Sequence, residues 1–183
     1  MELHNAINLG LLILRVAVGF TMIAHGYNHI WGGGKIAGTA RWFESLGMKP
    51  GTLHAWLASL TELGAGTLLI VGFLTPLAAA GVVGTMLVAL ITNHLKNGFF
   101  IFRPGEGYEY VFNLIAAGLA LGAIGAGSWS IDRLVNDTRP FSYLFGWKGF
   151  AVTLVAGVGG ALLLLAVFWR PEKKPEPAPE DAA

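Results

Sequence analysis

Six ionisable residues lie within or beside long apolar stretches of this sequence: Arg15, His25, His29, Glu62, His94 and Glu109. A cation at the centre of a bilayer costs about 2.5–3.5 kcal/mol on insertion scales, so such residues pair with one another or mark a functional site. His25 and His29 are four residues apart and share one helix face, and Arg15 falls within about 80° of that face. We expect this face to point into a helix bundle.

These side chains allow three interpretations. Buried His and Glu residues exchange protons, so a polar pocket at one membrane face could bind a quinone and relay protons to it. The His-x-x-x-His spacing with carboxylates also supplies the ligand types of iron, zinc or manganese, although no haem-ligand signature is present. In the structural interpretation, His29 is interfacial, His94 caps a helix, and an Arg15–Glu62 ion pair fixes helix register. The sequence leaves the metal content unknown and a quinone as the candidate cofactor.

The elements that position these residues are five apolar stretches, each long enough to cross about 30 Å of hydrocarbon as a helix. They cover residues 7–30, 53–73, 76–95, 110–129 and 149–169. The chain of 183 residues is 54% hydrophobic and 13% charged, with a mean hydropathy of +0.60, whereas soluble domains are about a quarter charged. The sequence therefore predicts an all-α integral membrane protein with the lipid bilayer as its main surroundings.

Charge and cysteine usage exclude several classes of function. Twelve Lys and Arg against eleven Asp and Glu give a net charge of +1, without the basic face that nucleic-acid binding requires. Nucleic acid is therefore not an expected partner. The chain has no cysteine, which excludes disulfides, thiolate metal sites and iron–sulfur ligation. Electrons for any redox chemistry must come from a cofactor, a quinone or a partner protein.

Helix depths predict how the polar residues meet. Glu62 lies nine residues into the second stretch, about 13 Å deep, and Arg15 lies eight residues into the first stretch, about 12 Å from the opposite side. The two depths agree to within several ångströms, so the sequence predicts an Arg15–Glu62 ion pair between antiparallel helices. Because successive helices alternate in direction, the three histidines and Glu109 gather towards the same membrane face as Glu62.

The flanking segments predict an orientation. The first and third loops and the C-terminal segment carry eight basic residues, and the other side carries three, Arg133, Arg139 and Lys148. The positive-inside rule places the eight in the cytoplasm. Residues 36–46 have the pattern of a short interfacial helix. Residues 170–183 contain four of the eight prolines and no large apolar residue, which predicts a disordered cytoplasmic tail.

Four separated blocks resemble the pattern of a known family, in order and in spacing. They are Leu14-Arg15-Val16 through Gly19 to His25-Gly26, Glu62-Leu63-Gly64 through Leu69 to Gly72, His94 to Phe100 followed by Glu109, and Gly125-Ala-Gly-Ser-Trp-Ser-Ile-Asp132. These blocks resemble the DoxX family of small bacterial membrane proteins, which is related to the DoxD-type subunit of thiosulfate:quinone oxidoreductase.

The resemblance implies a four-helix transmembrane bundle over residues 1–134, in the plasma (inner) membrane of a bacterium. It also implies association with redox and sulfur-handling proteins, in thiosulfate oxidation with quinone or in oxidative-stress defence. This chain departs from the pattern through a loop and a fifth transmembrane helix at 135–169, and through the tail at 170–183.

Two functional hypotheses follow, and they leave open whether the chain is an enzyme. The favoured hypothesis is a non-catalytic subunit that anchors or organises a membrane redox complex, either in oxidative-stress defence or in the respiratory chain. The alternative is a quinone-reactive oxidoreductase subunit. In that case His25, Glu62, His94 and Glu109 bind the quinone head and relay protons, and Arg15 orients Glu62.

Overall fold

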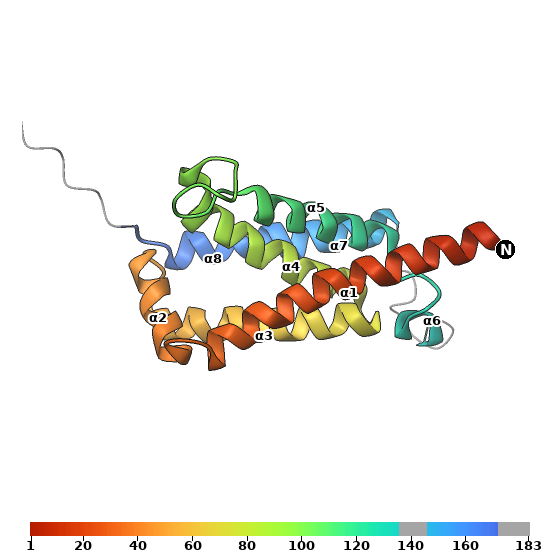
Figure 1. Cartoon of the computed structure of the whole chain (residues 1–183), viewed down its shortest axis with the longest axis horizontal. Coiled ribbons are helices and arrows are strands. Elements are labelled where there is room, and N and C mark those ends of the chain that lie inside the picture. The colour runs from red at the N-terminus through yellow and green to blue at the C-terminus, as the bar shows by residue number, and fades with distance from the viewer. Residues whose placement is uncertain (136–145, 172–183) are drawn as a thin grey trace, which may run out of the picture.

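The computed structural model describes residues 1–135 and 146–171, and within these ranges the chain is built from helices (Figure 1). The helices are α1 (Glu2–Trp31), α2 (Lys35–Ser45), α3 (Gly51–Val71), α4 (Thr75–Ala89), α5 (Glu109–Ile124), α6 (Ile131–Val135), α7 (Trp147–Leu154) and α8 (Gly160–Phe168). A π-helical turn (Leu90–His94) and a 3₁₀ turn (Leu95–Asn97) prolong α4, and a second π-helical turn (Val155–Gly159) joins α7 to α8.

Four of the continuous helical segments are long and apolar enough to cross a membrane: Glu2–Trp31, Gly51–Val71, Thr75–Asn97 and Trp147–Phe168. The fifth apolar helix, α5, has only 16 residues. The predicted all-α membrane fold is therefore confirmed, but the predicted end of the fourth stretch at residue 129 is wrong. Gly125 takes a φ of 81° and ends α5, and the next residues form a turn.

Close backbone approaches set the packing of α1 on α3. A Cβ added at Gly19 would lie 2.6 Å from the Gly66 carbonyl oxygen, and one at Gly26 would lie 2.8 Å from that of Ser59. Glycine at these positions lets the two helices pack tightly in the absence of water. On the other side of α3 lies α4, which also packs against α5 and the C-terminal helix of α7 and α8. The buried centre of the bundle includes Met22, Leu69 and Val82.

The bundle has two distinct ends (Figure 1). At the first, called the α2 end, lie α2, the loop after Asn97 and the end of α8; the N-terminus and α6 lie at the other, the α6 end. The first loop, the third loop and the start of the C-terminal segment, which the sequence predicted to share one side, therefore lie together at the α2 end. Trp169 Nε1 donates to the Leu46 carbonyl oxygen at 2.9 Å, and the Arg170 amide donates to that of Gly47 at 2.8 Å, so the end of α8 is tied to the loop after α2.

Helix α2 confirms the short helix predicted from the pattern of residues 36–46. Arg139 and the tail beyond Pro171 lie outside the described residues. The disorder of the tail and the cytoplasmic position of its two lysines therefore stay predictions. The division into segments at residues 134 and 169 also stays a prediction.

Candidate functional site

A cavity of about 580 Å³ opens at the α2 end, between α3, α4 and the C-terminal helix. Four of the six predicted residues line it: His25, His29, Glu62 and His94. Three further ionisable residues, which the sequence did not single out, also line it: His54, Glu106 and Tyr110. Of the six predicted residues, Arg15 and Glu109 are not among the lining residues. Apolar walls with a few convergent polar groups are typical of a small-molecule site.

Glu62 pairs with His29. Its carboxylate is buried, and Oε2 lies 3.0 Å from Nδ1 of His29. Neither of these two atoms has another hydrogen-bond partner among the described residues. Because burying an isolated carboxylate is expensive, the imidazole of His29 is the partner that stabilises the buried Glu62 side chain. This arrangement can hold a proton at the wall of the cavity.

The predicted Arg15–Glu62 ion pair is wrong. Gly26 of α1 packs at the level of Glu62, since a Cβ added at Gly26 would lie 3.1 Å from the Glu62 Cβ, and Arg15 is eleven residues, or about 16 Å, further along α1. The depth argument failed because close packing of Gly26 on Ser59 and of Gly19 on Gly66 sets the register of α1 against α3, and distance from a membrane boundary does not. Arg15 therefore lies level with the last turn of α3.

Arg15 instead joins the end of α3 to the turn after α5. It is fully buried, and it donates from Nη1 to the carbonyl oxygens of Leu69 at 3.0 Å and Ile70 at 3.1 Å, and from Nη2 to that of Trp129 at 2.6 Å. The last carbonyl groups of a helix lack intrahelical partners and carry partial negative charge, which suits a guanidinium. Gly72 leaves the space, since a Cβ there would overlap the guanidinium.

The Gly-x-Gly-x-x-Ser-x-Asp block completes this arrangement at the α6 end. Asp132 accepts hydrogen bonds from the Leu74 amide at 2.8 Å, the Thr75 amide at 3.0 Å and the Thr75 hydroxyl at 2.7 Å. It thereby caps the start of α4. The Asn8 side chain accepts from the Ser128 amide at 2.7 Å. The block at residues 125–132 thus holds three helices together at the α6 end, far from the cavity.

The other histidines are held in different ways. His25 Nε2 lies 3.2 Å from the Tyr110 hydroxyl, and the two rings stack at 5.9 Å. His94 contacts the Glu106 carbonyl oxygen at 2.9 Å through Nδ1. Glu109 accepts from the Ile101 amide at 3.3 Å, so it orders the loop after Asn97 and lies outside the cavity lining. Within the described residues, no group of three or more His, Asp or Glu side chains is arranged to hold a metal ion.

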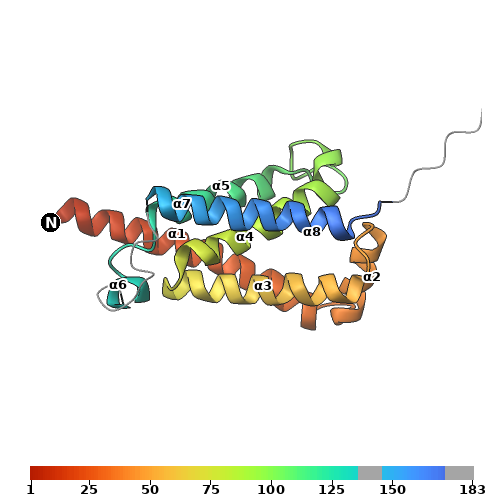
Figure 2. The ribbon, with the colours of Figure 1, turned by 180° about the vertical axis from the view of Figure 1, so that it is seen from behind.

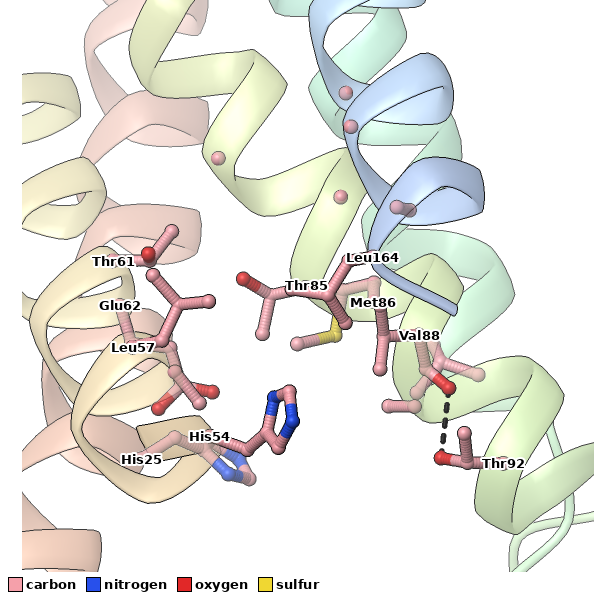
Figure 3. Close-up of a pocket in the computed structure, with 18 of the residues that line it drawn as sticks. His25, His54, Leu57, Thr61, Glu62, Thr85, Met86, Val88, Thr92 and Leu164 are labelled. Atoms are coloured by element: carbon pink, nitrogen blue, oxygen red, sulfur yellow. Dashed lines mark hydrogen bonds between the residues drawn. The ribbon is translucent and has the colours of Figure 1, made fainter. Parts of the chain in front are cut away.

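His54 is a site residue that sequence reasoning missed. Its side chain is 2% exposed, and Nε2 has no hydrogen-bond partner among the described residues. The ring hydrogen-bonds the Lys49 backbone, which fixes the tautomer and leaves Nε2 as an acceptor. Figure 3 shows the imidazole reaching from α3 towards Met86. The signal was available, because His54 is eight residues before Glu62 and shares its helix face.

This architecture is that of a multi-pass membrane bundle with a polar cavity at one end. Comparison with known proteins agrees that the chain is a membrane protein. The DoxX family model matches residues 10–95. Inner membrane protein YqjF of Escherichia coli (strain K12) is 32% identical over 132 residues, which are 70% of this chain and 94% of that protein. No solved structure matches. The chain belongs to the DoxX family, and the relative and the apolar helices support a multi-pass inner membrane protein.

Proposed function

We propose that this protein is a quinone-binding membrane subunit of a redox complex. The observation that carries the proposal is the cavity, in which the His29–Glu62 pair and the unpartnered Nε2 of His54 face a predominantly apolar space. A planar quinone head presents two oxygens on an apolar ring, which matches such a lining. The anchoring role alone gives no reason for a buried imidazole with an open acceptor site, so the geometry favours the quinone-reactive hypothesis.

The side chains suit the reduced form in particular. A hydroquinone donates two hydroxyl protons, and His54 Nε2 and the Glu62 carboxylate are both acceptors. Interconversion of hydroquinone and quinone moves two protons and two electrons. The His29–Glu62 pair and His54 hold protons, with His25 and Tyr110 beside them. The chain has no cysteine, and we infer that a membrane or peripheral redox protein exchanges the electrons, which retains the predicted role in a complex.

We also propose how the protein is oriented in the membrane. The loops at the α2 end and the C-terminal segment after α8 together carry eight of the twelve Lys and Arg residues, and the positive-inside rule therefore places this end of the bundle, with the cavity, in the cytoplasm. A reporter that is active only in the periplasm, fused after residue 171, should give no signal. Strong reporter activity would place the cavity mouth on the periplasmic side.

Titration of the purified full-length protein in nanodiscs with a water-soluble benzoquinone tests binding, because Trp42 lines the cavity and its fluorescence should be quenched. Glu62→Gln and His25→Ala should each weaken binding about tenfold, as expected for loss of one good polar contact. His4→Ala is the matched control, because His4 contacts Ser128 at the α6 end. Unchanged affinity in both site variants would refute the proposal. Native mass spectrometry of gently extracted protein would identify a redox partner.

A further inference from the structure

The cavity lies along α4. Eleven of its lining residues lie on α4 and its prolongation, and eight of these, at positions 77, 80, 81, 84, 85, 88, 89 and 92, follow one another at helical spacing, while Met86, Asn93 and His94 lie beside them. This spacing of three and four residues describes one continuous helix face. From Leu77 to Thr92 it extends about 22 Å at 1.5 Å per residue, which is most of the thickness of a hydrocarbon core. The cavity is therefore a groove along α4 that reaches well past the polar groups.

Two helices form the walls of this groove. Leu57, Ala58 and Thr61 of α3 line one side, and Gly157, Gly160 and Ala161 line the other. Both walls pack on α4, and Figure 2 shows α3 and the C-terminal helix on opposite sides of α4, with α2 across one end. The groove is thus flanked along its length by two membrane-spanning helices, with α2 beside its opening.

The two parts of the groove differ in polarity. Beyond Glu62, towards the α6 end, the α4 face consists of Leu77, Ala80, Gly81 and Gly84, and Gly157 stands opposite. These residues offer no charged side chain. A Cβ added at Gly84 would lie 3.2 Å from the Gly157 carbonyl oxygen, so α4 and the C-terminal helix are in contact here, and an apolar chain lies over this contact on the cavity side. All the ionisable lining residues gather at the α2 end. A ligand that fills the whole groove must therefore have a polar head and an apolar chain.

The lining also selects the charge of the head. Its carboxylates are Glu62 and Glu106, and none of the described residues that line it is Lys or Arg. A phosphate-bearing lipid would bring its negative charge beside two carboxylates without a cation to compensate, which is costly at low dielectric. A neutral head that hydrogen-bonds to His54 Nε2 satisfies that buried atom without adding charge. The lining therefore disfavours phospholipids and favours a neutral, chain-bearing lipid.

We propose that the groove binds a long-chain quinone, with its head beside His54 and its isoprenoid or alkyl chain along α4 between α3 and the C-terminal helix. This inference rests on the proposed function and names the class of quinone. It assigns a binding role to the C-terminal helix, which lies beyond the stretch that the family model matches. Gly157, Gly160 and Ala161 are the residues of that helix that contact the chain.

Two neighbouring glycines give a matched test. A Cβ at Gly160 or at Gly159 would meet no atom within 4 Å, so Leu fits at either position without a backbone clash. Only Gly160 lines the groove. Gly160→Leu should therefore obstruct the chain, and Gly159→Leu should leave the groove open. Ala156→Leu, four residues before Gly160 on the same lining, is a second variant in case the first fails to insert.

The probes are a benzoquinone without a chain and its decyl derivative, titrated against full-length protein in nanodiscs by Trp42 fluorescence. Gly160→Leu should weaken binding of the decyl quinone about tenfold, the equivalent of losing contact for roughly two methylene groups, and leave the chain-free quinone within about twofold. Gly159→Leu should change neither. Comparison between the variants cancels the partitioning of the decyl quinone into lipid.

Four results would overturn the inference. Unchanged decyl-quinone affinity in Gly160→Leu and Ala156→Leu would show that the chain lies elsewhere, while the proposed function stands. Equal weakening of both quinones would mean that the substitution disturbs the head site instead. Failure of the wild-type protein to bind either quinone would overturn the proposed function and the inference together. In native mass spectra of gently extracted protein, a long-chain quinone is the expected adduct, and a phospholipid retained in its place would contradict the proposal.

Discussion

Replacing Arg15 by Met should destabilise the bundle and leave quinone binding unchanged. The guanidinium donates three hydrogen bonds to carbonyl oxygens on two segments. At about 1.5–3 kcal/mol for each hydrogen bond with a charged group, the gross contribution is roughly 4–9 kcal/mol. Desolvation of the buried cation offsets part of this. Truncation of a buried charged partner typically costs about 3–5 kcal/mol, and we expect a loss of that size.

The assay is unfolding in mixed micelles with increasing dodecyl sulfate, followed by circular dichroism. Val16→Met is the matched control, because Val16 is the next residue and is 40% exposed on the outer face of α1; its free energy of unfolding should change by no more than about 0.5 kcal/mol. A loss below about 1 kcal/mol in Arg15→Met would refute the structural role of the guanidinium.

The same variants separate the two ends of the bundle. Arg15 lies about 16 Å along α1 from the level of Glu62, so quinone affinity in Arg15→Met should stay within about twofold of wild type. Glu62→Gln should weaken binding and leave the folding free energy less affected than Arg15→Met does. Equal loss of quinone affinity in both variants would contradict this separation of the two ends of the bundle. It would favour the Arg15–Glu62 ion pair that the helix depths predicted.

Two further predictions concern the α6 end. Asp132→Ala removes three hydrogen bonds to Leu74 and Thr75 and should cost about 1–2 kcal/mol as a lost helix cap. Asp132→Asn should retain part of that stability, and identical thermal melts of the two variants would contradict this prediction. Gly72→Ala should cost at least about 1 kcal/mol in the same melts, because φ is +66° there and the added Cβ overlaps Arg15. The control is Gly64→Ala, whose added Cβ meets open space; it should be neutral or stabilising by up to about 1 kcal/mol.

Hydropathy was sufficient to predict most of the fold. Apolar stretches of about twenty residues predict spanning helices because a bilayer leaves the backbone no other way to satisfy its hydrogen bonds. The end of α5 was missed because apolarity continues past Ile124 through Ala126, although Gly125 already carries the positive φ that stops the helix. Hydropathy averages over such a residue, whereas backbone conformation depends on it.

The site was predicted only in part, for two physical reasons. Residue spacing within one helix is fixed, so His25 and His29 were predicted to share a face, and both line the cavity. Register between helices is set by local packing such as Gly26 against Ser59, which no count of residues from a membrane boundary provides. That is why Glu62 was assigned to the wrong cation. His54 was overlooked because it lies near the start of a helix, where the sequence resembles an interfacial position, although its spacing from Glu62 places both residues on one helix face.

Glycine shows how the two halves of this bundle divide their roles. Gly19 and Gly66 face the backbone of the opposite helix so closely that a Cβ would overlap it, and these residues therefore bring α1 and α3 together. Gly160 faces open space and lines the groove, so there the missing side chain creates volume. The same residue type thus closes one helix interface and opens another. What decides between the two outcomes is whether a backbone or a cavity stands opposite, and this explains why a glycine pattern alone could not locate the site.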